Sequence, residues 1–173
     1  MSSSLTDHFR MLSRYNTLAN RRLYDACARL SDADRKRPRP AFFKSIHGTL
    51  NHILIGDRIW LTRFSGSEAP STQLDAILYD DFEALRAARE KEDARIETFA
   101  AGLTDLFLEC TVRYVNHQGK LFEDSLPMLV AHLFNHQTHH RGQVHDLLSQ
   151  TDVAPPELDL HRVIKPTPAT KAV

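Results

Sequence analysis

The stretch that decides the fold is HLFNHQTHHRGQVHDLL, His132–Leu148, in which apolar and histidine side chains recur every three or four residues. This period predicts an amphipathic helix. We expect the helix to begin near Asp124 or Ser125, with Pro127 in its first turn, where a missing N–H is tolerated. It should end near Gln150. The helical period then decides which of the five histidines face the rest of the protein.

Two of these histidines, His136 and His140, fall on the apolar face of the predicted helix. At about 100° per residue they lie about 40° apart, within the stripe formed by the apolar residues. That stripe contains Leu129, Leu133, Val144 and Leu147. By the same count, His132 and His139 lie on its flank and His145 lies opposite, so these three are weaker candidates for a shared site.

A metal ion is one explanation for two inward-facing histidines. A buried imidazole without a partner costs roughly 1–3 kcal/mol, and residues four apart on a helix can bind one ion together, as in HExxH zinc helices. The alternative is that His136 and His140 are core residues bonded to carbonyls or to neighbouring side chains. A metal site needs a third ligand. The second helix offers His47 and His52, and the third places Glu92 in its apolar stripe.

The rest of the chain is also mainly helical. Apolar residues with a helical period predict further helices over residues 5–30, 46–64 and 80–103. Alternation from Leu108 to Tyr114, followed by the turn-forming NHQG at 116–119, predicts a short β-hairpin. The basic stretch at 35–39 contains Pro38 and is expected to be a solvated loop. The proline-rich tail is expected to form an extended strap with a frayed end.

These elements predict an all-α fold, a four-helix bundle with a short β-hairpin insertion before the fourth helix. We expect a single domain over residues 1–164 and a disordered tail over 165–173. A chain of 173 residues with 42% hydrophobic residues is large enough for one buried core.

Composition excludes several classes of function. Lys and Arg together number 22, as do Asp and Glu, so no net positive charge attracts nucleic acid. The two cysteines, Cys27 and Cys110, form no CxxC pair and favour neither a disulfide framework nor a thiolate zinc site. No apolar run of about 18 residues predicts a membrane helix. We therefore expect a cytoplasmic protein without nucleic-acid or membrane partners.

Several motifs together resemble the DinB/YfiT-like family of metal-dependent enzymes. They are Asn51-His52-Ile53 with Asp57 and Trp60 downstream, NHQTHHRGQ at 135–143, and PPELD at 155–159. The resemblance spans nearly the whole chain. It implies a four-helix bundle, usually a homodimer, in which three histidines hold a divalent metal ion. On this sequence the ligands are His52, His136 and His140, with His47 as the runner-up for the first position.

The resemblance also implies a chemistry. It favours a metal-dependent transferase that uses a low-molecular-weight thiol, with a metal-dependent hydrolase as the alternative. A non-catalytic metal- or ligand-binding bundle with a role in stress is a third reading. We expect one divalent ion per chain, with zinc or nickel favoured over iron, cobalt or manganese. The substrate is expected to be a small molecule, whose identity no residue pattern names.

Gln143 and Asp57 are the candidate catalytic groups beside the metal, since both fall on inner stripes of their helices. Glu92 is a further acidic candidate. The alternative for each is a hydrogen bond in the bundle interior or a surface position. Arg141 and His139 are expected to face solvent or a partner chain.

Overall fold

A computed structural model describes residues 4–67, 72–116 and 118–165. Four long helices form a bundle: α1 (Leu5–Ala28), α3 (Ile46–Phe64), α4 (Phe82–Ala101) and α6 (Leu126–Ser149). The remaining elements are the short helices α2 (Asp32–Lys36), α5 (Asp105–Leu108) and α7 (Leu160–Ile164), and the strands β1 (Thr111–Val115) and β2 (Leu121–Ser125). The predicted four-helix bundle with a hairpin before its last long helix is confirmed.

The helices begin where the sequence supplies capping groups. The Ser4 hydroxyl accepts the Asp7 N–H while the Asp7 carboxylate accepts the Ser4 N–H, which makes a capping box at α1. Ser45 caps α3 and Asp81 caps α4 in the same way, each through one side-chain oxygen. In α6, Pro127 lies in the first turn. These local signals explain why the predicted helix starts agree with the structure to within a few residues.

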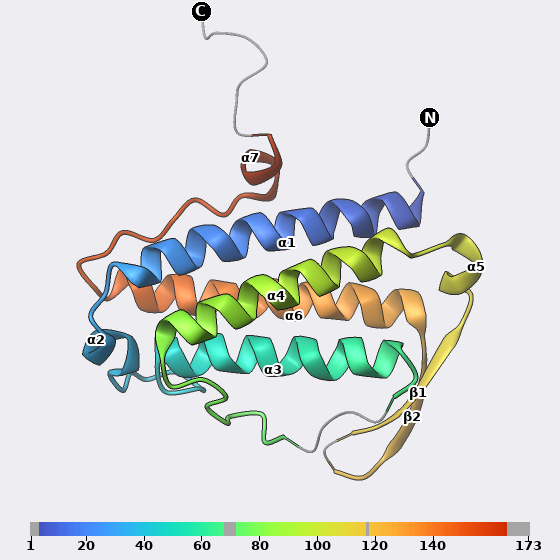
Figure 1. Ribbon diagram of the computed structural model, residues 1–173, viewed down its shortest axis with the longest axis horizontal. Coiled ribbons are helices and arrows are strands. Elements are labelled where there is room, and N and C mark those ends of the chain that lie inside the picture. Colours follow the sequence, from blue (N-terminus) through green and yellow to red (C-terminus); the bar gives the residue numbers. More distant parts are fainter. Residues whose placement is uncertain (1–3, 68–71, 117, 166–173) are drawn as a thin grey trace, which may run out of the picture.

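The order of the helices in the bundle puts α3 beside α6. α1 packs against α4 and α6, while α3 packs against α6 and α4 (Figure 1). α3 and α4 run in the same direction, so the chain between them must return along the bundle, and α6 runs antiparallel to α3. The described part of that return segment lies against α3, where the Tyr79 N–H donates to the Asn51 side-chain oxygen over 3.0 Å.

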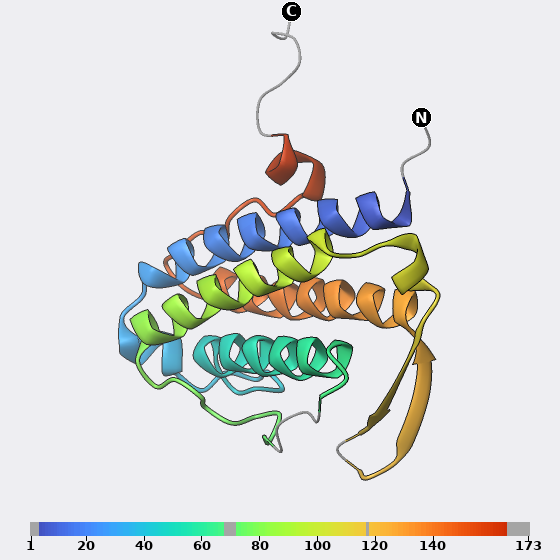
Figure 2. The same cartoon turned by 45° about the vertical axis from the view of Figure 1, so that its right-hand side comes forward.

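The hairpin extends from one end of the bundle, beside the C-terminal end of α3 (Figure 2). Its strands are antiparallel, with Thr111 opposite Ser125 and Val115 opposite Leu121. Leu108, predicted to be in the first strand, instead ends α5. The Thr104 hydroxyl accepts the Phe107 N–H and starts a helical turn there, which buries Leu108. The local cap therefore overrides the short alternating pattern.

Two other segments differ from expectation. Part of the segment expected to be a loop forms α2, because Ser31 caps the Asp34 N–H and Lys36 pairs with Asp32 over 2.9 Å. The strap after α6 ends in α7, whose Val163 packs against α1 near Tyr15 and Ala19. The expected disordered tail, 165–173, lies outside the described residues except for Lys165.

The apolar core consists of two large clusters, in addition to the small one at Val163. One cluster includes Leu23, Leu54 and Val144, and the other includes Phe9, Leu61 and Leu133. Between these positions each long helix places buried polar side chains. These are Asn16 and Asn20 on α1, His52 and Asp57 on α3, Arg89, Glu92 and Asp93 on α4, and Gln137, His140 and Arg141 on α6. The functional candidates thus lie in a polar layer across the middle of the bundle.

None of the helices in the described part of the chain is both long enough and apolar enough to cross a membrane.

Candidate metal centre

Three histidines meet where α3 packs against α6. His52 projects from α3, and His136 and His140 project from successive turns of α6. The Nε2 atom of His52 lies 3.1 Å from Nε2 of His136 and 3.2 Å from Nε2 of His140. One ligand atom from each of the three lies within 4.8 Å of the others, so the cluster could hold a metal ion.

Hydrogen bonds at the other ring nitrogens fix two of the three tautomers. His52 Nδ1 lies 2.8 Å from the backbone oxygen of Leu74, and His140 Nδ1 lies 2.8 Å from the side-chain oxygen of Gln143. Both oxygens can only accept, so both Nδ1 atoms carry a proton and donate it. In the neutral ring, Nε2 then presents a lone pair to the centre of the cluster.

Burial keeps these rings neutral. It lowers the pKa of His52 from 6.5 to about 4, against the raising effect of the Leu74 carbonyl. It lowers the pKa of His136 to about 3, helped by the neighbouring His140 and His52, and it also lowers the pKa of His140. At neutral pH the three residues are therefore imidazoles, the form that binds metals.

The spacing of the Nε2 atoms fits a divalent ion. The lone pairs of His52 and His140 are both directed at the centre across 3.2 Å, and a cation between them would remove their repulsion. Around a tetrahedral zinc ion, ligand nitrogens about 2.0–2.1 Å from the metal are about 3.3 Å apart. The two Nε2 separations of 3.1 and 3.2 Å are close to this value, so the three histidines could hold a metal ion.

His136 reaches this centre because α3 has a glycine opposite it. A Cβ atom added to Gly56 would lie only 2.6 Å from Cε1 of the His136 ring. The Nδ1 atom of His136 is buried and has no hydrogen-bond partner within the described residues. Steric contact with α3, rather than a hydrogen bond, therefore limits where this ring can lie.

An aromatic side chain covers one face of the His52 ring. Phe43 stacks on His52 with ring centroids 3.7 Å apart, and its edge faces His140 at 5.6 Å. The following residue, Lys44, has φ of 67°, a left-handed conformation that allows the chain to turn into α3 directly after Phe43. The sequence reasoning did not identify Phe43, because its contact with His52 depends on this turn.

The other histidines considered do not join the cluster. The Nε2–H of His47, the runner-up ligand, donates to the Tyr79 carbonyl over 2.8 Å, so this ring is engaged outside the cluster. His139 is exposed and lies 3.2 Å from the Gln143 amide, and His145 bonds the Pro156 carbonyl over 3.1 Å. His132 is exposed one turn before His136.

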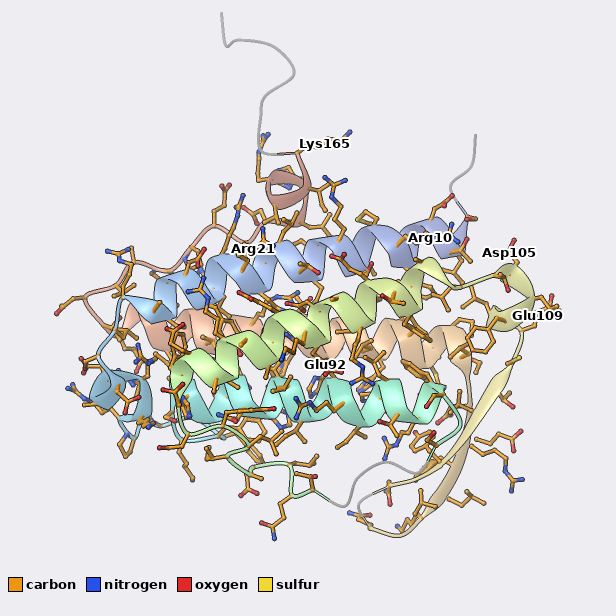
Figure 3. The ribbon with its side chains drawn as sticks, in the orientation of Figure 1. Arg10, Arg21, Glu92, Asp105, Glu109 and Lys165 are labelled. Atoms are coloured by element: carbon orange, nitrogen blue, oxygen red, sulfur yellow. The ribbon has the colours of Figure 1, made fainter. Side chains whose placement is uncertain are left out.

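The candidate acid and amide groups occupy two different places. Gln143 lies beside the histidine cluster and orients His140. Asp57 is fully buried behind it, paired with Arg89 over 2.5 Å and hydrogen-bonded to the Gln137 amide. Glu92 lies on the side of α4 that faces α3 (Figure 3), where it pairs with Arg58 over 3.4 Å and with Arg95 over 2.7 Å. Asp57 and Glu92 therefore make ion pairs inside the bundle, the arrangement expected as the alternative for each, and a catalytic role for Asp57 stays a prediction.

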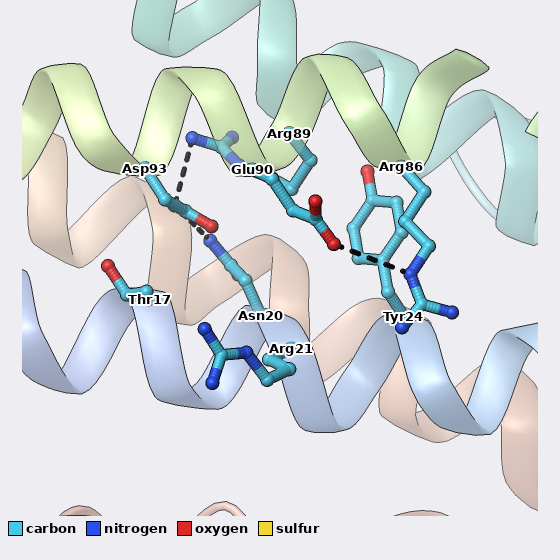
Figure 4. Close-up of a pocket in the computed structure, with 8 residues that line it drawn as sticks. All are labelled: Thr17, Asn20, Arg21, Tyr24, Arg86, Arg89, Glu90 and Asp93. Carbon is cyan, nitrogen blue, oxygen red and sulfur yellow. Dashed lines mark hydrogen bonds and ion pairs between the residues drawn. The ribbon is translucent and has the colours of Figure 1, made fainter. Parts of the chain in front are cut away.

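The buried network around Asp57 includes Arg141, Asn20 and Arg89, whose importance the sequence reasoning missed. Arg141, expected at solvent or a partner chain, is only 2% exposed and donates to Asn16 and Gln137. Asn20 and Arg89 both contact Asp93, between α1 and α4 (Figure 4). A signal was present, since Asn16 interrupts the apolar stripe of the first helix. The partners of that asparagine required the packing of all four helices.

Gln137 and Arg141 directly follow the two clustered histidines of α6. Their hydrogen bonds to α3 and α1 are made on the inner side of α6. This anchoring sets the rotation of α6 about its own axis. The same rotation presents His136 and His140 to His52.

The fold and the site together define a class of protein, a four-helix bundle in which one helix supplies a single histidine and another supplies an HxxxH pair. A family model described as DinB family matches residues 1–171, and the chain belongs to this family. Protein DinB of Bacillus subtilis (strain 168) is 25% identical over 185 aligned positions, which cover 97% of this chain and 100% of that protein.

Solved structures support the same fold. A crystal structure of a DinB-like protein from Bacillus cereus ATCC 10987 superposes with a TM-score of 0.62, over 83% of this chain and 90% of that one. The sequences are 19% identical, so this likeness concerns the fold alone.

Proposed function

We propose that this protein is a metal-dependent enzyme that transfers a group to the sulfur of a small thiol. His52, His136 and His140 would hold one divalent ion per chain. The observation that carries the proposal is that the lone pairs of His52 and His140 converge while their Nδ1 protons are bonded to the Leu74 and Gln143 oxygens. Imidazole ligands favour zinc or nickel, and they are also compatible with iron, cobalt or manganese.

Three neutral ligands leave the ion its full charge, which lowers the pKa of a thiol or water molecule bound to it. The protein's own residues hold the site. Leu74 and Gln143 keep the rings oriented, and Phe43 excludes water from the face of His52 on which it stacks. In the transfer, the thiol loses its proton to solvent, a carbon–sulfur bond forms, and the leaving group departs from the electrophile with its electron pair.

The metal assignment is tested by elemental analysis of protein purified without chelator. We expect close to one divalent ion per chain, and we expect the alanine variants of His52, His136 and His140 to lose most of it. The matched controls are His47→Ala and His145→Ala, which remove histidines bonded to backbone carbonyls and should keep the metal. Full metal content in all three cluster variants would contradict the assignment.

The chemistry is tested with metal-loaded protein, a panel of small thiols and monobromobimane as the electrophile. Conjugation should be faster than with the His140→Ala variant, and the bimane thioether and bromide should appear in equal amounts. Equal rates for both proteins would contradict the transferase. If the same preparations instead accelerate hydrolysis of p-nitrophenyl acetate, a metal-dependent hydrolase replaces the transferase as the proposed function.

A further inference from the structure

A half-buried arginine, Arg63, lies about three helical turns beyond His52 on α3. The Arg63 guanidinium lies over the rings of Trp60, at 4.7 Å, and Tyr114, at 4.5 Å, and it donates one hydrogen bond to the Val115 carbonyl over 3.0 Å. Its buried Nε has no hydrogen-bond partner among the described residues, and none of the ion pairs found there includes it. The nearby Asp124 carboxylate accepts the Tyr114 hydroxyl instead.

Among the residues that the structure describes, no carboxylate pairs with this arginine. Burial lowers the pKa of Arg63, but an arginine remains protonated in proteins. Each of the other arginines on α3 and α4 pairs with a carboxylate. Arg58 pairs with Glu92, and Arg89 pairs with Asp57 and Asp93. A cation that is partly removed from water and lacks a counter-ion is suited to bind an anion.

A row of side chains joins Arg63 to the histidine cluster. The Trp60 ring contacts His132 at a centroid distance of 5.0 Å, and His132 lies 6.0 Å from His136. Arg63 is close enough to His132 to lower its pKa through charge repulsion, after the larger effect of burial. Because α3 and α6 are antiparallel, Gly56 faces His136, Trp60 faces His132, and Arg63 follows one turn later.

We propose that Arg63 binds a carboxylate of the substrate, with the Trp60 ring beneath the chain that links this carboxylate to the atom bound at the histidine cluster. The rise of 1.5 Å per helical residue places the Cα atom of Arg63 roughly 16 Å along α3 from that of His52, a gap that the two side chains and the bound thiol would span together. The inference rests on the proposed function and gives it a substrate class, a short-chain thiol that bears a carboxylate. The planar guanidinium can donate two parallel hydrogen bonds to such a group.

Arg63 also has a structural role that must be separated from this one. Its contacts with Tyr114 and Val115 attach β1 to α3. If attachment were its only role, removing the guanidinium would lower stability without changing which ligands bind. The test must therefore measure ligand preference as well as stability.

The experiment compares thiols that differ only in the distal group. Protein loaded with Co(II) is titrated with 3-mercaptopropionate against 3-mercaptopropan-1-ol, and with 6-mercaptohexanoate against 6-mercaptohexan-1-ol, and the change in the cobalt absorption spectrum gives each Kd. For at least one pair, we expect the acid to bind roughly tenfold tighter than the alcohol. The ratio should approach 1 in Arg63→Gln and be partly retained in Arg63→Lys.

Two controls keep the result interpretable. Arg113→Gln removes an exposed hairpin arginine that pairs with Glu123 over 3.4 Å, and it should leave the acid-to-alcohol ratio unchanged. In the unaltered protein, added sodium chloride should weaken binding of the acid and not of the alcohol. This control does not depend on any variant folding.

Each outcome bears on the proposal. Equal binding of acid and alcohol by the unaltered protein would overturn the carboxylate site and leave the thiol site in place. An unchanged ratio in a less stable Arg63→Gln variant would overturn it in favour of hairpin attachment alone. If no thiol changes the cobalt spectrum, both this inference and the proposed transferase are contradicted.

Discussion

At the scale of single residues, Gly56 decides how closely His136 can approach α3. Most helix glycines lower stability, because glycine loses more backbone entropy than alanine on folding. At this position the absence of a side chain makes room for the His136 ring, which would otherwise lie 2.6 Å from a Cβ atom. Gly56 therefore lowers the stability of α3 but leaves the space that the histidine cluster needs.

Gly56→Ala should separate folding from metal binding. Alanine favours the helix by up to about 1 kcal/mol, while its methyl group displaces the end of the His136 side chain. We expect little loss of thermal stability in the metal-free protein and at least a roughly tenfold weaker zinc affinity, comparable to other perturbations around metal ligands. Gly142→Ala is the matched control, since a Cβ there meets nothing within 4 Å. Equal zinc affinities in the two variants would argue against this role.

At the scale of the helices, the polar layer ties the bundle together around Arg89. This side chain is 2% exposed and pairs with Asp57 over 2.5 Å and Asp93 over 3.1 Å, from α3 and its own helix α4. Buried ion pairs add little net stability, but removing one partner leaves the other charges without compensation. The layer therefore favours one alignment of the four helices over others.

Arg89→Leu should destabilise the protein by about 3–5 kcal/mol, because it leaves Asp57 and Asp93 buried without a cation. Urea unfolding followed by circular dichroism measures the change. Arg86→Leu, one turn away on the same helix, removes a more exposed arginine that pairs with Asp25 and Glu90, and it should cost less than about 1 kcal/mol. Similar losses in both variants would contradict the importance given to the buried pair.

The elements themselves were largely predictable, and the exceptions are local. All four long helices follow from long apolar periods, with a side-chain cap at the start of α1, α3 and α4 and a proline in the first turn of α6. α2, α5 and α7 have four or five residues each, too few for a period to identify. Leu108 shows the limit, since its alternation with Cys110 predicted a strand and the Thr104 cap produced a helical turn.

At the scale of the whole molecule, folding buries His52 and His136 as neutral rings, which makes stability depend on pH. Their pKa values fall from 6.5 to about 4 and about 3 on folding. As the pH falls from 6.5 toward these lower pKa values, the two rings bind more protons in the unfolded chain than in the folded one, so acid favours unfolding. The stabilisation is fully present above pH 6.5 and is lost as the pH falls toward 4 and 3.

Chelator-treated protein should therefore unfold at lower urea concentrations at pH 4.5 than at pH 7. The His52→Gln/His136→Gln double variant should show a smaller difference, because it lacks the two rings with the most strongly lowered pKa values. Urea titrations of both proteins across this range provide the measurement. A midpoint for the unaltered protein that does not change between pH 7 and 4.5 would contradict the prediction.

The sequence by itself determined the long helices, the inward direction of His136 and His140, and, through family resemblance, the choice of His52. A repeating helical period carries that information, because residues four apart share a face wherever the helix packs. Only the tertiary structure decided that the Nε2 atoms of His52 and His140 lie 3.2 Å apart, that the Leu74 carbonyl orients the His52 ring, and that Arg141 is buried. These features join residues 22 to 125 positions apart, or depend on which side of α6 the other helices cover, and no local pattern in the chain encodes such contacts.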